Sequence, residues 1–161
     1  MLKQHILDMY DFTCWGRDRM LDTAKPLTAE QFDQETRFPI HTVKETLVHT
    51  LSAEYAYRMR CQGQTYKGMD KKDFADLAAV RARWAQEEKE MRSYLAGIDE
   101  ASLAGIVRYK VSSGDEFERT RLALLTQLCF HGMQHRAEIA QMLTEFGHSP
   151  GNIDYTVFKY G

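Results

Sequence analysis

The stretch FHGMQHRAEIAQMLTEFG, Phe130–Gly147, has the spacing of an amphipathic helix, but two histidines interrupt its apolar side. At about 100° per residue, one side of this helix collects the apolar residues Leu124, Leu128, Ile139, Met142 and Phe146. His131 and His135 lie in the middle of that side, one helical turn apart. Core side chains normally occupy such positions, so the two imidazoles need a physical explanation.

Two explanations fit this pair of histidines. A single histidine on an apolar face is usually a core residue that is hydrogen-bonded to a neighbouring group. Two histidines at i and i+4 can reach one metal ion, and a buried polar group without a partner costs about 1–3 kcal/mol. Because the motif alone is only moderately specific for metal, a third ligand is needed to favour the metal site.

The other histidines of the chain are His5, His41, His49 and His148. Three of them lie near the N-terminus or in loops, where we expect solvated or capping side chains. His49 instead lies inside the helical segment TLVHTLSAEYAYR, and its helical neighbours are the small residues Ser52, Ala53 and Ala56. Small neighbours leave room for an imidazole that reaches another helix. We therefore predict that His49, His131 and His135 hold one divalent ion.

Three histidines from two helices leave coordination positions open, which is typical of catalytic rather than structural metal sites. Imidazole alone does not select the metal, because zinc, nickel, copper and iron all bind it. Glu138 falls within about 20° of His131 around the helix. We expect it to be a fourth ligand, an acceptor for a ligand ring or a catalytic proton shuttle. Gln127 lies one turn before His131 and faces the same way. The alternative for Glu138 and Gln127 is an ordinary solvated polar group.

The rest of the chain predicts an all-α fold, a four-helix bundle in one domain spanning residues 1–161. Apolar periodicity and helix caps place the long helices at Leu2–Ala24, Thr42–Cys61, Asp73–Leu95 and Thr120–Phe146. Capping boxes are expected at Thr28–Gln31 and Thr42–Glu45. The alternating stretch Ile106–Thr120, centred on SSGD, predicts a short hairpin or an irregular excursion. The tail GNIDYTVFKYG is apolar enough to pack back onto the bundle.

The expected core around the candidate site comprises Trp15, Leu51, Tyr55, Leu124, Leu128, Ile139 and Met142. For Trp15 the alternative is a partly exposed surface aromatic, because large aromatic side chains are seldom fully buried.

Composition excludes several classes of function. Hydrophobic residues make up 43% of the 161 residues and charged residues 27%, as in ordinary globular proteins. The net charge is −2 with no basic block, which argues against nucleic acid as a partner. No segment has the length and apolarity of a signal peptide or a membrane span, so we expect a cytoplasmic protein without a membrane partner. Three widely spaced cysteines, Cys14, Cys61 and Cys129, predict free thiols in a reducing compartment.

The order of motifs along the whole chain resembles the DinB, or damage-inducible, superfamily. These motifs are YDFTCWGRDRML in the first helix, TLVHTLSAEYAYR in the second, and LLTQLCFHGMQHRAEIAQMLTEFG followed by PGNIDY. The resemblance implies an up-up-down-down four-helix bundle, often a homodimer, with a divalent ion held by His49, His131 and His135. Zinc and nickel are the metals it favours, with iron, manganese or copper as alternatives.

The resemblance has two departures, both beside the predicted ligands. The family commonly has His-Arg-Gly-Gln where this chain has HRAE, so that Ala137 and Glu138 replace Gly and Gln. A further histidine that is often found at the place of Gln127 is absent. Both changes leave the ligand pattern intact and alter the surroundings that decide the substrate.

Relatives implied by the resemblance include transferases that use bacillithiol or mycothiol and thiol-dependent maleylpyruvate isomerases. We therefore expect a thiol transferase in which the metal activates a low-molecular-weight thiol toward a small-molecule electrophile, with Glu138 handling protons. A metal-dependent hydrolase that activates water is the alternative within enzymes. A non-catalytic metal-binding stress-response module, or an interaction bundle whose histidines lie far apart, remains open from other classes.

Overall fold

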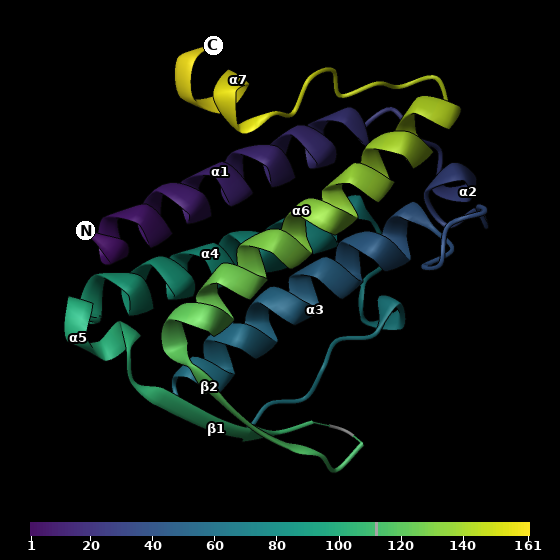
Figure 1. Cartoon of the computed structure of the whole chain (residues 1–161). Helices are drawn as coiled ribbons and strands as arrows, with labels where there is room; N and C mark the ends of the chain where they lie inside the picture. Colours follow the sequence, from purple (N-terminus) through teal and green to yellow (C-terminus); the bar gives the residue numbers. More distant parts are fainter. Residues whose placement is uncertain (112) are drawn as a thin grey trace.

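Four long helices lie side by side in the computed structural model, which describes residues 1–111 and 113–161 (Figure 1). They are α1 (Leu2–Thr23), α3 (Val43–Cys61), α4 (Leu77–Gly97) and α6 (Arg121–Glu145). The shorter elements are α2 (Ala29–Phe32), the 3-10 helix η1 (Lys71–Asp73), α5 (Glu100–Leu103), α7 (Tyr155–Tyr160) and strands β1 (Ile106–Lys110) and β2 (Glu116–Thr120). The predicted all-α four-helix bundle is therefore confirmed. Within the described residues, no helix has the length and apolarity that crossing a membrane requires.

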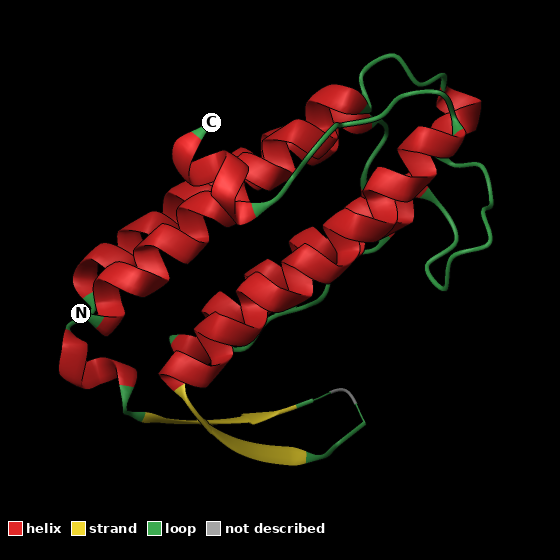
Figure 2. Cartoon of the chain, turned by 45° about the horizontal axis from the view of Figure 1, so that its top comes forward, coloured by secondary structure: helices red, strands yellow, loops and turns green. Residues whose placement is uncertain are grey.

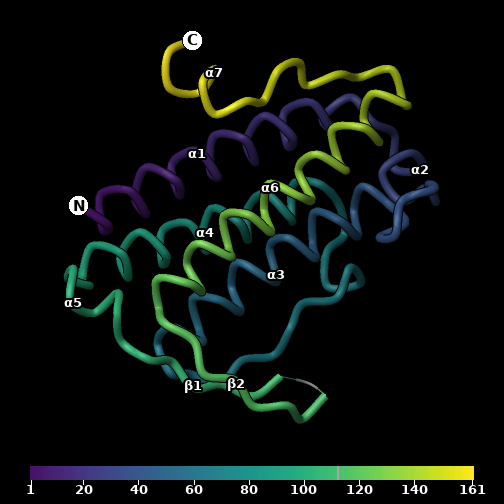
Figure 3. The backbone as a smooth tube through the Cα atoms, viewed as in Figure 1, coloured from purple at the N-terminus to yellow at the C-terminus, as the bar shows by residue number. Residues whose placement is uncertain are grey.

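The directions of the four helices follow from contacts at one end of the bundle. The N-terminal amine of Met1 lies 3.1 Å from the Glu100 carboxylate, just after α4 ends. Arg121, the first residue of α6, donates to the carbonyl oxygen of Cys61, the last residue of α3. Helices α1 and α6 thus run in one direction and α3 and α4 in the other (Figures 1 and 3).

Along the chain this arrangement reads up, down, down, up, which differs in order from the up-up-down-down path that the resemblance implied. The physical reason is that the connection 24–42, which contains α2, stays at the end of the bundle where α1 stops and turns the chain back there (Figure 3). The segment 62–76 then has to run along the bundle to reach the start of α4 (Figure 1). This crossover segment passes α3, where the backbone N–H of Met69 donates to Ser52 Oγ at 3.0 Å.

Helices α3 and α6 begin one residue after their predicted starts, because a threonine caps each of them locally. Thr42 accepts from the backbone N–H of Glu45 at 3.0 Å and so caps α3. The Glu45 carboxylate itself lies 3.6 Å from Lys71 Nζ. The capping box at Thr28 and Gln31 forms in both directions.

The predicted start of α4 at Asp73 is wrong. The helix begins at Leu77, after Asp76 accepts from the backbone N–H of Ala79 at 2.9 Å. Phe74 is buried although its backbone is extended. Its apolar side chain therefore fitted the helical pattern of the sequence without being part of the helix. Asp73 belongs to the preceding turn of 3-10 helix.

The predicted hairpin is present at one end of the bundle (Figure 2). Strands β1 and β2 pair antiparallel, from Ile106 opposite Thr120 to Lys110 opposite Glu116. The predicted turn SSGD begins at Ser112, which lies outside the described residues. Val107 of β1 is buried and belongs to the core near the ends of α3 and α4.

Most of the expected core is confirmed. Leu51, Leu124, Leu128, Ile139 and Met142 are buried. Trp15 and Tyr55 are wrong as core residues, since both are only half-buried. Trp15 stacks on Phe12, and its ring lies 5.7 Å from Phe158 of α7, so it faces the C-terminal tail. This contact also confirms that the tail packs back onto the bundle.

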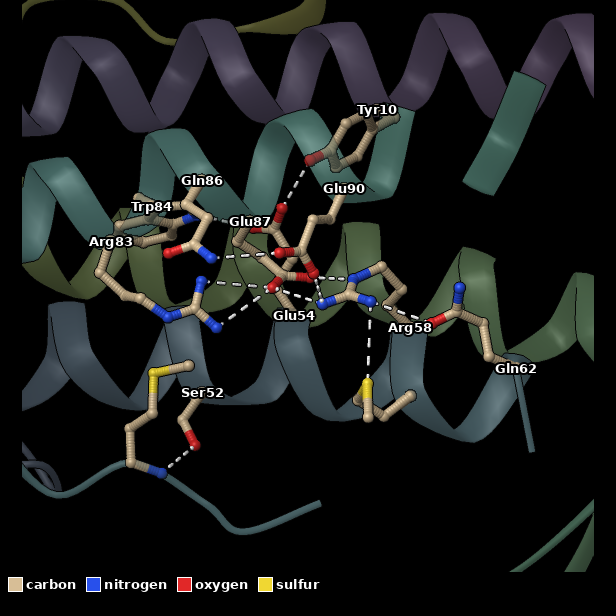
Figure 4. A network of polar contacts seen from close by, with 12 residues as sticks. Tyr10, Ser52, Glu54, Arg58, Gln62, Arg83, Trp84, Gln86, Glu87 and Glu90 are labelled. Carbon is tan, nitrogen blue, oxygen red and sulfur yellow. Dashed lines mark hydrogen bonds and ion pairs between the residues drawn. The ribbon is translucent and has the colours of Figure 1, made fainter. Parts of the chain in front are cut away.

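A layer of buried polar groups interrupts the apolar core between α3 and α4 (Figure 4). Glu54 accepts from the Tyr10 hydroxyl at 2.6 Å and from Trp84 Nε1 at 2.7 Å. Burial raises the pKa of this carboxyl, while the two hydrogen bonds oppose the rise. Arg58 and Glu87 form a buried ion pair with N–O distances of 2.6 and 2.9 Å. These contacts thus join α3 to α1 and α4 through buried polar side chains.

Candidate metal centre

The structure brings His49, His131 and His135 together where α3 packs against α6 (Figure 1). The Nε2 atom of His131 lies 3.2 Å from Nε2 of His49 and 3.2 Å from Nε2 of His135. One nitrogen of each ring lies within 4.8 Å of the others. Helical spacing aligns the two rings of α6, and the packing of α3 against α6 brings in the third.

These separations suit a shared ion. Nitrogen ligands at about 2.0–2.1 Å from one metal lie roughly 3 Å from each other. Three neutral imidazole nitrogens that approach this closely without a proton between every pair repel one another, whereas a cation at their centre would bind all three lone pairs. The donor set therefore fits a divalent ion of the kind that imidazole binds.

The exposure of the three rings decreases across the site. His49 is exposed, His131 is half-buried and His135 is 5% exposed. A surface cleft of about 480 Å³ borders His49 and is walled by the crossover residues 69–72. The centre is thus reachable by small molecules from the α3 side, while His135 anchors it in the core.

Glu138 orients the innermost ring. Its Oε2 lies 2.7 Å from Nδ1 of His135, so Nδ1 donates and Nε2 is left with its lone pair toward the other rings. Carboxylates that hold a ligand histidine in this way fix its tautomer and raise its basicity. Of the three roles expected for Glu138, the structure contains the acceptor for a ligand ring.

The environment favours the neutral form of His49 and His131. Burial, followed by the neighbouring imidazoles, lowers the pKa of His131 to about 4. Burial and the nearby His135 also lower the pKa of His49. Neutral imidazoles are the form that binds metal, so protons compete weakly for this site near neutral pH.

Gln127 lies one turn before His131 and is exposed. Its side chain contacts Tyr57, and the Tyr57 ring lies 6.4 Å from that of His131. Tyr57 was not predicted as a site residue, although it follows His49 by about two helical turns. The polar hydroxyl of Tyr57 in the same helix as His49 is the feature of the sequence that could have indicated this role.

Arg136, next to His135, is another residue whose environment the sequence did not reveal. It is 3% exposed and lines a small internal cavity together with His131, Glu54 and Arg17. Gly16 and Gly132 make room for it, because a Cβ on either would lie 2.8 or 3.0 Å from its guanidinium nitrogens. Burial lowers the pKa of Arg136 to about 10. Charged side chains thus lie on the inner side of the centre, among mostly apolar neighbours.

The remaining candidate groups lie apart from this centre. Within residues 1–111 and 113–161, the three histidines form the cluster that could hold a metal. His5 and His41 are exposed and His148 is half-buried. The three cysteines are free and buried, and burial raises their pKa values, to about 12 for Cys14 and about 11 for the other two. A protein thiolate is therefore no part of this site.

Comparisons with known proteins agree with the fold. The sequence model of the DinB family matches residues 1–161. A solved DinB-like protein from Bacillus cereus ATCC 10987 has a TM-score of 0.65 and 18% identity, over 92% of this chain and 95% of that one. YfiT from Bacillus subtilis, described as a probable metal-dependent hydrolase with an unusual four-helix bundle topology, has a TM-score of 0.65 and 15% identity, over 91% of this chain and 90% of that one. No curated protein is significantly similar in sequence.

Proposed function

Because this chain belongs to the DinB family, we propose that it is an enzyme whose three converging histidines hold one divalent metal ion. The observation that carries the proposal is the approach of His49 and His135 to within 3.2 Å of His131, all through Nε2. Zinc or nickel is the metal we expect, with iron, manganese or copper as alternatives.

The ion would supply one kind of chemistry, which is to lower the pKa of a thiol or water that binds it. His49, His131 and His135 would hold it, and Glu138 would orient His135 through Nδ1. The cleft beside His49 would admit the reactants. Glu138 is also the acidic group nearest the buried ring, so we propose it as the acceptor of the proton that the nucleophile releases.

We propose thiol transfer as the reaction. A low-molecular-weight thiol loses its proton, its sulfur attacks an electrophilic carbon of a small molecule, a C–S bond forms and the leaving group departs with the bonding electrons. The buried cysteines support an external thiol, because none of the three is suited to be the nucleophile at neutral pH.

Hydrolysis is the second candidate. It is favoured by the similarity in fold to YfiT, which is described as a probable metal-dependent hydrolase. In this reaction water replaces the thiol as the nucleophile, and the same histidines and Glu138 have the same roles.

Two assays on metal-loaded protein separate the candidates. The first follows 1-chloro-2,4-dinitrobenzene with cysteine, glutathione or bacillithiol, and the second follows hydrolysis of 4-nitrophenyl acetate without thiol. Thiol transfer predicts turnover in the first assay that is lost in the His131→Ala variant and kept in His148→Ala, whose ring lies outside the centre. Turnover confined to the second assay would replace transfer by hydrolysis. If metal-loaded protein gives no more than the uncatalysed rate in both assays, an enzyme of either kind is contradicted.

A further inference from the structure

Outside the metal centre, the guanidinium of Arg60 is enclosed by three tyrosine rings. Its Cζ lies 5.3 Å from the ring centre of Tyr57, 5.5 Å from Tyr66 and 4.6 Å from Tyr109. The rings come from three different segments, namely α3, the crossover segment and β1. Cation–π contacts on several faces hold a guanidinium in a fixed position without neutralising its charge.

Arg60 also lacks an acidic partner. Across the described part of the chain, no carboxylate oxygen lies within ion-pair distance of it, and its Nε is buried without a hydrogen-bond acceptor. Arg58, two residues earlier on α3, is by contrast paired with Glu87 at 2.6 Å and Glu90 at 2.5 Å. A fixed, unpaired guanidinium is a ready donor for an oxyanion, because its planar fork matches carboxylate and phosphate oxygens.

The groove beside Arg60 has the size and charge for such a ligand. It encloses about 660 Å³ between crossover residues 63–66 and 68 on one side and residues 108–111, at the end of β1, on the other. This volume is in the range of small-molecule sites. The charged side chains that line it are Arg60, Arg108 and Lys110, with no acidic residue among the lining. Arg108 and Lys110 are paired with Glu118 and Glu116 across the hairpin, which leaves Arg60 as the uncompensated cation.

Tyr57 lies between Arg60 and the metal centre. The ring of Tyr57 contacts Arg60 on one side and lies 6.4 Å from the His131 ring on the other. Arg60 follows His49 by eleven residues, which places it on nearly the same face of α3, about 16 Å further along the axis. A reactant that touches both places therefore has to be elongated along α3.

We propose that this groove binds the carboxylate or phosphate group of a small-molecule reactant of the histidine centre, with Arg60 as the residue that selects the oxyanion. The inference deepens the proposed function, and it rests on that function in one respect, namely that the bound molecule reacts at the histidine centre. The oxyanion site itself depends only on Arg60 and its three tyrosines, so it can be tested without metal.

The test uses the full-length, metal-free chain, titrated with inorganic phosphate and with succinate at constant ionic strength. Binding is measured by calorimetry and by the NMR signal of the Arg60 side-chain Nε–H. Arg60→Gln removes the positive charge near the C-terminal end of α3 and should keep the fold. Arg119→Gln is the matched control, because Arg119 is an exposed arginine of the same hairpin that does not line the groove.

We expect saturable binding of at least one oxyanion, a shift of the Arg60 signal, and at least tenfold weaker binding in Arg60→Gln. Arg119→Gln should stay within twofold of the wild type. Absence of saturable binding in the wild type, or equal weakening in both variants, would overturn the oxyanion site and leave the metal centre untouched. Arg60-dependent binding in a protein that takes up no metal would instead overturn the proposed function and leave the oxyanion site standing.

Discussion

His135 presents Nδ1 to Oε2 of Glu138 at 2.7 Å, one helical turn further along α6. This contact leaves Nε2 of His135 facing Nε2 of His131 at 3.2 Å. The carboxylate thus decides which nitrogen of the innermost histidine is free for a metal. Glu138 thus acts on the centre through a ligand, which is one of the roles that the sequence predicted for it.

Glu138→Ala should weaken metal binding by about 10–100-fold, because loss of a carboxylate that orients a ligand histidine costs this much. Glu138→Gln keeps an acceptor oxygen and should lose less. Competition with a chromogenic chelator at pH 7.5 measures both affinities. Glu145→Gln, an exposed glutamate at the end of the same helix, is the control. Equal affinity in Glu138→Ala and the wild type would show that the contact does not support the centre.

The stability of the metal-free protein should depend on the protonation of His131. Its pKa is lowered to about 4 in the folded chain and is about 6.5 when unfolded, so the unfolded chain binds more protons between these values. The stabilising contribution is therefore fully present above pH 6.5 and is lost as pH falls toward 4. Urea midpoints from pH 7 to 4.5 should fall less steeply in His131→Asn than in the wild type. Parallel slopes would contradict the lowered pKa.

Gly16→Ala should destabilise the protein by about 1–3 kcal/mol, as overpacking of a core does. An added Cβ would lie 2.8 Å from Nε and 2.9 Å from Cδ of the buried Arg136, which has to move. Gly97→Ala is the control, since nothing lies within 4 Å of its added Cβ. Denaturant unfolding should show the control unchanged or up to about 1 kcal/mol more stable. If Gly16→Ala is as stable as Gly97→Ala, the tight seat of Arg136 is refuted.

Arg58→Met should cost about 3 kcal/mol or more, because it leaves the fully buried Glu87 without its close partner (Figure 4). Arg83 is the remaining partner of this carboxylate, but at 3.4 Å it lies further away than Arg58 does. Replacing both partners, Arg58→Met with Glu87→Leu, should recover part of the loss. Lys25→Met, in an exposed pair with Asp22, should change stability by less than about 1 kcal/mol. A double variant less stable than the single one would contradict this reading of the pair.

The sequence could predict those features that depend on one helix at a time. His131 and His135 share a face because they are four residues apart, and Thr42 caps α3 through a residue three positions away. His49 was identified from its small neighbours, which is still local information. These features carry the four-helix bundle and the candidate ligands.

Several other contacts that join distant segments could not be predicted. Phe74 has the apolar character of a helical position, yet it is buried ahead of α4, so the start of that helix was placed too early. Trp15 faces the tail because of where α7 docks. The seat of Arg136 joins α1 and α6, and the three rings around Arg60 come from three segments. No periodicity within one segment encodes such contacts.

The central claim is that His49, His131 and His135 hold one metal ion, and metal content tests it most directly. Protein expressed and purified without added metal or chelator, at pH 7.5, is analysed by elemental mass spectrometry as the wild type, as the His131→Ala, His135→Ala double variant and as His148→Ala. The account predicts about one equivalent of a divalent transition metal in the wild type and His148→Ala, and less than about a tenth in the double variant. Equal metal content in the wild type and the double variant, with both folded by circular dichroism, would contradict it.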